Sequence, residues 1–334
     1  MKILSLHQDR AMFGNSAYRY VIPYTEIGRN NHIAEWSHLE DFEKIAKGTN
    51  LDFTIYDIVS VQRLFFKRKN FPKMHKFVHD VDDDVLHRQR KLFKDVKERR
   101  NYENTLNRVD AITVSTNYLK NVMQKQFDKP VFVCPNAMDV RIFDAIELPK
   151  NKPLIFGLTG GPTHYKDWKV AGKILPDIMK DNPEWMLYII GFVPDYLEKL
   201  ENQFPNRVVN IDFFVPYPAY TRLLKLIDVR LSPLDVEDTF NHSKSAIASM
   251  EMMACSHISI AQKINVYEEV VRNGYNGFLC NSENEWFNTT QKVLKDGLLR
   301  RQIGKNGRDF ILKNHDIRVL VHEWIKSYED IMRL

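Results

Sequence analysis

The sequence predicts an α/β protein made of two domains, each with a parallel sheet covered by helices. Two observations support this prediction. Short apolar runs with the composition of buried strands alternate along the chain with segments of helical periodicity. The 334 residues are enough for two domains of ordinary size, and a stretch that contains Pro149, Lys150 and Lys152 separates two such alternating halves.

Each half begins with an apolar strand, the second one at Leu154. We therefore expect one domain over residues 1–148 and a second over residues 149–312. Residues 313–334 carry apolar side chains at helical spacing and should form a C-terminal helix. Other expected elements are strands at 52–63, Asp110–Ser115, Val131–Cys134, Trp185–Gly191, Val208–Phe214 and His257–Ala261, and a charged helix at Leu86–Asn107.

The composition is that of a soluble globular protein, with 44% hydrophobic and 27% charged residues. No apolar run reaches the roughly 18 residues of a membrane-spanning helix, and the apolar N-terminal run is too short for a signal peptide. The three cysteines, Cys134, Cys255 and Cys280, are far apart and form no C-x-x-C pair. This pattern favours a reducing, cytoplasmic location and argues against a structural zinc site.

Positive charge is concentrated in one segment, residues 61–100. This segment has thirteen basic and six acidic residues, whereas the whole chain has a net charge of only +5. A polyanionic partner would gain from such a segment. A solvated basic face explains the same pattern equally well.

A strand–helix–strand pattern over Asp228–Leu279 gathers polar groups where its first helix should begin. The N-terminus of a helix presents free N–H groups and the positive end of a dipole, which suits a phosphate group. Lys244 adds a full positive charge there, and Ser243 or Ser245 could cap the helix. Farther along, Glu251 could accept hydrogen bonds from the two adjacent hydroxyls of a ribose. A plain α/β unit with a solvated lysine and glutamate would have the same pattern.

The order of these elements resembles the donor-binding half of GT-B glycosyltransferases. It is most similar to the retaining group 1 (family 4) type, through N-x-S-K-S at 241–245 and Y-x-E-x-V-x-x-G-x-N-G-F-L at 267–279. The resemblance implies two Rossmann-like domains whose parallel sheets face a central cleft, with the C-terminal helix crossing back to the first domain. It also implies that the helix start holds the diphosphate of a nucleotide sugar and that the helix glutamate holds its ribose. These roles fall on Asn241, Ser243, Lys244, Ser245 and Glu251, with Lys244 in a catalytic position.

The sequence departs from the family at the first glutamate of the Glu-x7-Glu pattern. Ser243 stands eight residues before Glu251, so the family's first glutamate is absent in that register. Glu237 and Asp238 are the candidates to replace it.

A second donor-binding motif follows the strand that begins at Leu154. The family pattern G-x-x-x-H-x-x-D matches Gly160, His164 and Asp167, and two successive glycines, Gly160 and Gly161, would let backbone N–H groups approach a phosphate. The arginine and lysine of the better-known family pattern are absent, which leaves Lys166 and Lys169 as candidates for the diphosphate.

Two sets of candidates lie in the first domain. Gly14, Asn15 and Arg19 follow the first strand, where the family brings donor and acceptor close to the backbone, although a simple strand-to-helix turn has the same composition. His79 or Asp80, at the end of a strand, could take the proton of an acceptor hydroxyl. A capping acidic turn is the alternative. No metal is expected, because the helix dipole and Lys244 can neutralise the diphosphate.

The sequence thus predicts a glycosyltransferase that moves a sugar from a nucleoside diphosphate sugar to a hydroxyl, with retention and without a tightly bound cofactor. A UDP-sugar is the favoured donor. The acceptor candidates are polyanionic: a hydroxymethylated base in DNA, as for phage enzymes, or a teichoic or phospholipid-linked glycan. Peripheral membrane contact stays open.

Two predictions of another class are kept, a nucleotide-sugar epimerase and a non-catalytic DNA-binding module. A nicotinamide oxidoreductase is disfavoured, because residues 7–14 after the first strand do not fit G-x-G-x-x-G.

Overall fold

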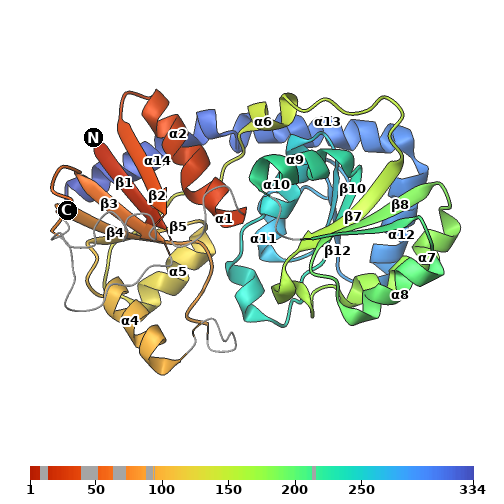
Figure 1. Cartoon of the computed structure of the whole chain (residues 1–334), viewed down its shortest axis with the longest axis horizontal. Helices are drawn as coiled ribbons and strands as arrows, with labels where there is room; N and C mark the ends of the chain where they lie inside the picture. The colour runs from red at the N-terminus through yellow and green to blue at the C-terminus, as the bar shows by residue number, and fades with distance from the viewer. Residues whose placement is uncertain (8–13, 39–51, 63–72, 88–92, 94, 213–215) are drawn as a thin grey trace. The chain divides into compact units, whose positions relative to one another are not determined.

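The computed structural model describes residues 1–7, 14–38, 52–62, 73–87, 93, 95–212 and 216–334 (Figure 1). They divide into two compact units. The first unit comprises Met1–Ala137, Ser243–Ser245 and Ile317–Leu334, and the second comprises Met138–His242 and Ala246–Asp316. Within the described part of the chain, no helix has the length and apolar character needed to cross a membrane.

The first unit is built on a six-stranded sheet in the order β2-β1-β3-β4-β5-β6, in which every strand pair is parallel. The strands are β1 (Lys2–His7), β2 (Ile33–His38), β3 (Ile58–Gln62), β4 (Lys76–Val81), β5 (Ala111–Val114) and β6 (Val131–Val133). The helices are α1 (Gly14–Ser16), the π-helical turn η1 (Ala17–Val21), α2 (Ile22–Arg29), α4 (Val96–Leu106), α5 (Asn117–Gln126) and α14 (Ile317–Met332).

Side-chain alternation along the strands gives this sheet two buried faces. Leu4 and Leu6 of β1 lie in the core that includes residues of α4 and α5. Helices α2 and α14 pack against each other over the other face (Figure 1). The hydroxyls of Tyr24 and Tyr328 are hydrogen-bonded at 2.8 Å, and Trp324 Nε1 donates to the Pro135 carbonyl at 2.9 Å. The last helix is therefore part of the first unit.

The second unit repeats this architecture, with a six-stranded parallel sheet in the order β12-β11-β10-β7-β8-β9. The strands are β7 (Leu154–Gly160), β8 (Trp185–Gly191), β9 (Val208–Ile211), β10 (Val229–Ser232), β11 (Ile258–Gln262) and β12 (Phe278–Cys280). The helices are α6 (Val140–Asp144), α7 (Lys169–Asp181), α8 (Asp195–Gln203), α9 (Tyr217–Leu226), α10 (Ile247–Ala254), α11 (Asn265–Glu268), α12 (Glu283–Lys295) and α13 (Gly297–Asn314), with 3-10 turns η2 (Pro162–His164) and η3 (Thr239–Ser243).

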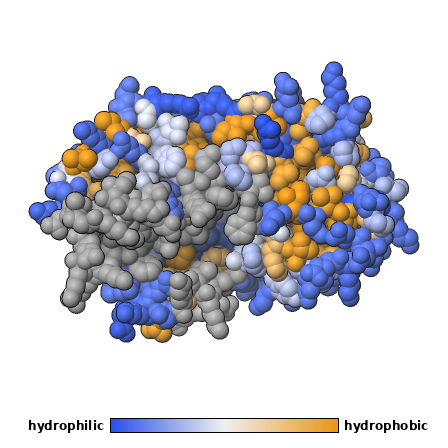
Figure 2. Space-filling model, in the orientation of Figure 1, coloured by the Kyte–Doolittle hydropathy of each residue, from blue (hydrophilic) through white to orange (hydrophobic). Residues whose placement is uncertain are grey.

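The two faces of this sheet carry different cores. Phe156 and Leu158 belong to the large core that includes residues of α7, α8 and α12, whereas Ile155 packs with Ile227 and Met252 on the opposite face. Figure 1 shows α7, α8 and α12 on one side of the sheet, and α9 and α10 on the other. Figure 2 shows polar residues around the rim of this unit and apolar residues gathered toward its middle.

The prediction of two parallel α/β layers is confirmed, but two predicted elements begin too early and one strand was missed. The strand region predicted over 52–63 is a strand only at β3, because Asp52 forms an isolated bridge and a turn follows it. Strand β2 was not anticipated. The charged helix starts at Val96, not near Leu86, because Asp95 caps it by accepting the Glu98 N–H at 2.7 Å.

Candidate functional site

The loop after β7 brings a histidine ring against the backbone of the strand end. A Cβ atom added to Gly160 would lie 2.5 Å from His164 Cδ2, which is closer than real contacts allow. Glycine is therefore required for His164 to occupy this position. The ring is stacked at 14° and 6.0 Å on Trp168, which is buried. Gly161 precedes the short turn η2, which ends at His164.

A buried carboxylate joins this loop to the loop after β10. One oxygen of Asp167 lies 2.7 Å from His164 Nδ1. Its other oxygen accepts the Asp235 N–H and the Asn241 side-chain amide, each at 2.8 Å. The Asp167 side chain is only 1% exposed, so these hydrogen bonds are shielded from water. The carboxylate thus fixes two loops that begin at the carboxyl ends of β7 and β10.

Asn241 is fully buried at the end of this network. Its amide nitrogen donates to Asp167 and, at 2.9 Å, to the Asp235 carbonyl. Its side-chain oxygen has no hydrogen-bond partner among the described residues. A buried acceptor without a partner is costly and suits a donor group of a ligand.

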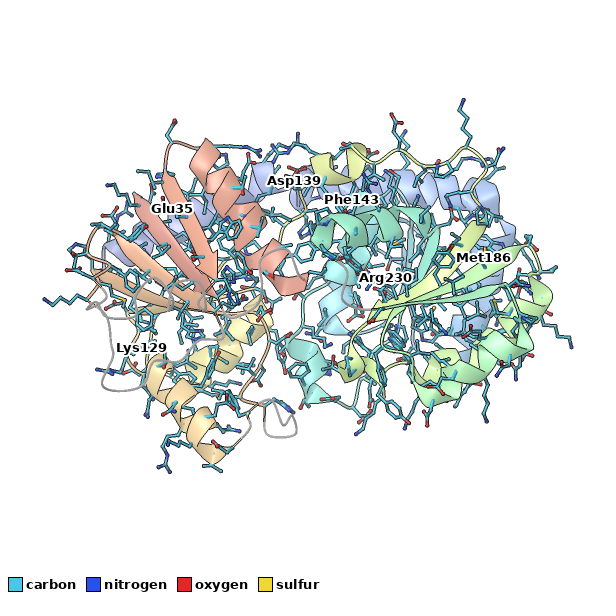
Figure 3. The ribbon with its side chains drawn as sticks, viewed as in Figure 1. Glu35, Lys129, Asp139, Phe143, Met186 and Arg230 are labelled. Carbon is cyan, nitrogen blue, oxygen red and sulfur yellow. The ribbon has the colours of Figure 1, made fainter. Side chains whose placement is uncertain are left out.

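Glu251 lies on α10 and is 2% exposed. Its carboxylate pairs with the Arg230 guanidinium, which β10 contributes, and accepts the Tyr220 hydroxyl at 3.3 Å. A second guanidinium nitrogen of Arg230 donates to the Thr159 carbonyl at 3.3 Å. Figure 3 labels Arg230 within the second unit. Arg230 was not anticipated as a site residue, although a charged residue inside the apolar run 229–234 was a visible signal.

The segment Ser243–Ser245 belongs to the first unit, and its serines do not cap α10 as predicted. The Ser243 hydroxyl accepts the Asp84 N–H at 3.1 Å, and the Ser245 hydroxyl accepts the Asn136 side-chain amide at 2.8 Å. Helix α10 begins later, at Ile247, and its first turn has no side-chain cap. Lys244 between the serines is half-buried. The diphosphate roles of these residues stay predictions.

The two candidates to replace the missing family glutamate lie in the loop before η3. Glu237 is exposed, and its N–H donates to Asp235 at 3.1 Å. Asp238 accepts the Phe240 N–H at 3.1 Å and so stabilises the start of the turn. Neither contact assigns chemistry to these carboxylates.

Asp80 and His79, the residues predicted to take the acceptor proton, both lie in the interior of the first unit. Asp80 is buried and ion-paired with Arg19, and it also accepts hydrogen bonds from Thr113 at 2.7 Å and Gln62 at 3.3 Å. His79 is fully buried, with its ring 5.0 Å from that of Tyr102. These contacts give both side chains a structural role, and their catalytic roles stay predictions.

Arg19 and Gly14, the candidates after β1, have structural explanations. Arg19 is buried and, besides Asp80, it donates to the Cys134 carbonyl at 2.5 Å and to Asn136 Oδ1 at 3.0 Å. Gly14 has a φ of +37°, which favours glycine whatever the space around it. A ligand role for Gly14 stays a prediction, and the side chain of Asn15 lies outside the described residues.

Most of the basic residues predicted to attract a polyanion also lie outside the described residues, in 63–72, 88–92 and 94. Carboxylates are clustered at 80–84, at the end of β4 and just after it. In the described ranges, no group of three histidine, cysteine or carboxylate side chains is placed to hold a metal ion.

Two parallel six-stranded α/β units of this kind define the GT-B class of glycosyltransferases. Residues 139–310, slightly more than half of the chain, match the family described as Glycosyl transferases group 1. The chain belongs to this family and is therefore a glycosyltransferase. The predicted GT-B class is confirmed, and the retaining family 4 subtype stays a prediction.

Relatives and solved structures agree with this family. The chain is 22% identical to the uncharacterized glycosyltransferase MJ1069 of Methanocaldococcus jannaschii, over 94% of this chain and 84% of that protein. Its fold is similar to that of a sucrose-phosphate synthase from Thermosynechococcus elongatus, with a TM-score of 0.68, 12% identity and full coverage of both chains. It is also similar to Anabaena Alr3699/HepE in complex with UDP and glucose, with a TM-score of 0.70 and 15% identity, covering 99% of this chain and 100% of that one.

Proposed function

We propose that this enzyme takes a sugar from a UDP-sugar bound to the second unit and transfers it to a hydroxyl group, with retention of the anomeric configuration. Loops at the carboxyl ends of parallel strands are where α/β sheets of this kind bind nucleotides. The loops after β7 and β10 occupy such an edge. HepE, a protein of similar fold, was solved in complex with UDP-glucose, which supports the choice of a uridine donor.

The Asp167 network is the observation that carries this proposal. It holds His164 beside Gly160 and fixes Asn241, whose side-chain oxygen has no partner among the described residues. In the proposal, the Gly160–Gly161 backbone and His164 contact the diphosphate, and Glu251 accepts the ribose hydroxyls.

Calorimetric titration with UDP-, GDP-, ADP- and CMP-sugars tests the donor half. We expect saturable binding of one class, the uridine one, and a loss of about tenfold or more in affinity for His164→Ala and Glu251→Gln. Glu283→Gln is the matched control, because Glu283 lies in the same unit but is 51% exposed and pairs with Lys173 at the surface. Unchanged affinity in both site variants would contradict the proposed donor site.

Retention is tested by the anomeric configuration of the first-formed product, followed by NMR. The support for retention is the resemblance to retaining group 1 enzymes, and an inverted product would overturn it. Incubation of the donor alone separates transfer from epimerisation, because an epimerase would convert the sugar without an acceptor.

For the acceptor we propose a hydroxyl-bearing polyanion, supported by the charge of residues 61–100. Transfer of radiolabelled sugar to hydroxymethylated DNA, to a teichoic-type glycan and to a neutral glycan would compare the acceptor classes. We expect an anionic acceptor to be used and its KM to rise steeply with salt. Preference for the neutral glycan, without salt dependence, would contradict this acceptor class.

A further inference from the structure

A buried arginine lies beneath the proposed ribose site. Arg230 is on β10, between Val229 and Leu231, which face the large apolar core. The Arg230 side chain points to the other face of the sheet and is only 7% exposed. Arginine is almost never buried to this extent unless it is paired, because removing its charge from water is costly. An apolar residue would be the expected occupant of this position.

The contacts of Arg230 connect the two proposed donor-binding elements. Through Nη1 it pairs with Glu251 on α10, and through Nη2 it donates to the carbonyl of Thr159, the residue before Gly160. Tyr220 adds a hydroxyl donor to the same Glu251 oxygen that Arg230 contacts. The Glu251 carboxylate is therefore oriented relative to the end of β7.

We propose that Arg230 is a positioning residue for the nucleotide, which holds the Glu251 carboxylate directed at the two ribose hydroxyls. This inference rests on the ribose role of Glu251 in the proposed function. Arg230 itself contacts no substrate in this proposal and acts through Glu251.

Three titratable groups near the pair are neutral at pH 7, because burial raises their pKa. The pKa of Tyr267, on α11, is raised to about 12, and that of Cys255, at the end of α10, to about 12. Burial and the nearby Glu251 also raise the pKa of Tyr220, on α9. The charge that pairs with the glutamate comes from Arg230. Without Arg230, the Glu251 carboxylate would lose its countercharge and the donor that fixes its direction.

The sharpest test compares UDP with 2′-deoxy-UDP by calorimetry, since the two ligands differ by one ribose hydroxyl. We expect the wild-type protein to bind UDP about tenfold more tightly than 2′-deoxy-UDP. Arg230→Met should lose most of this discrimination.

Two further variants keep the test valid if Arg230→Met folds poorly. Arg230→Lys retains the charge and should keep the preference for UDP. Arg207→Met removes a half-buried arginine of the same unit, for which the structure gives hydrogen bonds to carbonyls and a sulfur, and should lower the melting temperature without changing the discrimination. A full preference for UDP in Arg230→Met would overturn the inference.

The outcome for Glu251→Gln separates this inference from the proposed function. If Glu251→Gln keeps the wild-type preference for UDP, then the ribose site itself is wrong. If Glu251→Gln loses the preference but Arg230→Met keeps it, then only the role of Arg230 is wrong.

Discussion

Replacing Asp167 by alanine or by asparagine should have clearly different effects. Alanine removes three hydrogen bonds and leaves the Asp235 N–H and one N–H of the Asn241 amide without an acceptor in the interior of the unit. A buried polar group left unpaired costs about 1–3 kcal/mol, so two of them amount to about 2–6 kcal/mol. Asparagine can place its one oxygen where these two donors meet, because both donate to the same oxygen of Asp167.

The asparagine variant should therefore lose little stability but still impair the site. Its amide nitrogen would face His164 Nδ1, which donates its N–H to the ionised Asp167 carboxylate, so in the variant this nitrogen would have to accept a hydrogen bond instead. The ring must then carry its proton on Nε2 and cannot become positively charged without losing this hydrogen bond. If His164 contacts the diphosphate, Asp167→Asn should weaken UDP binding about tenfold while the free energy of unfolding falls by only about 1 kcal/mol.

Urea unfolding followed by fluorescence, together with calorimetry, measures both effects. Asp177→Asn on α7 is a suitable control, because it makes the same chemical change in the same unit. Equal destabilisation by the alanine and asparagine variants would refute the hydrogen-bond argument. Unchanged UDP affinity in both variants would show that the network does not support the donor site.

Three further predictions concern other parts of the chain. Burial lowers the pKa of His257 from 6.5 to about 4, so the unfolded chain binds the proton before the folded one. As the pH falls from 6.5 to 4, the free energy of unfolding should therefore fall by about 3 kcal/mol, and urea unfolding of His257→Gln should show a flatter dependence on pH. Trp36 is 37% exposed, while the other four tryptophans are at most 2% exposed. Acrylamide should therefore quench mainly the fluorescence of Trp36, and equal quenching in a Trp36→Phe variant would contradict the fold around β2. Arg19→Met should lower the free energy of unfolding by about 3–5 kcal/mol, because it leaves Asp80 buried without its countercharge. Adding Asp80→Asn should restore much of that loss in urea unfolding, and no recovery would mean that the ion pair is not the cause.

The sequence was most informative where strands are buried on both faces. Strands of this kind are continuous apolar runs, as in β7 and β11, and their positions were predicted closely. The edge strand β2 was missed because Glu35 and Trp36 are exposed on it and interrupt any apolar run. Helix α10 was predicted to begin too early, because Ser243 and Ser245 look like caps in the sequence but bind partners that are distant along the chain.

The candidate site was predictable in its motifs but not in its pairings. Gly160 and His164 could be singled out through the resemblance to a family pattern, and Glu251 through its place on the helix that follows Lys244. Local spacing could not reveal that Arg230 would meet Glu251, which is 21 residues away, because that pairing depends on how β10 and α10 pack. The same limit applies to Asp80, whose ion pair with Arg19 joins residues that are 61 positions apart in the chain.

Helix α14 has a consequence for how the protein is made. Tyr328 and Trp324 of this helix complete the first unit, but the last strand of that unit's sheet, β6, lies far earlier in the chain. During synthesis, the apolar face of α2 therefore stays uncovered until the whole second unit has emerged from the ribosome. Closing such a long-range contact is slow relative to local folding. We expect the nascent first unit to depend on chaperones until residues 317–334 are available to cover it.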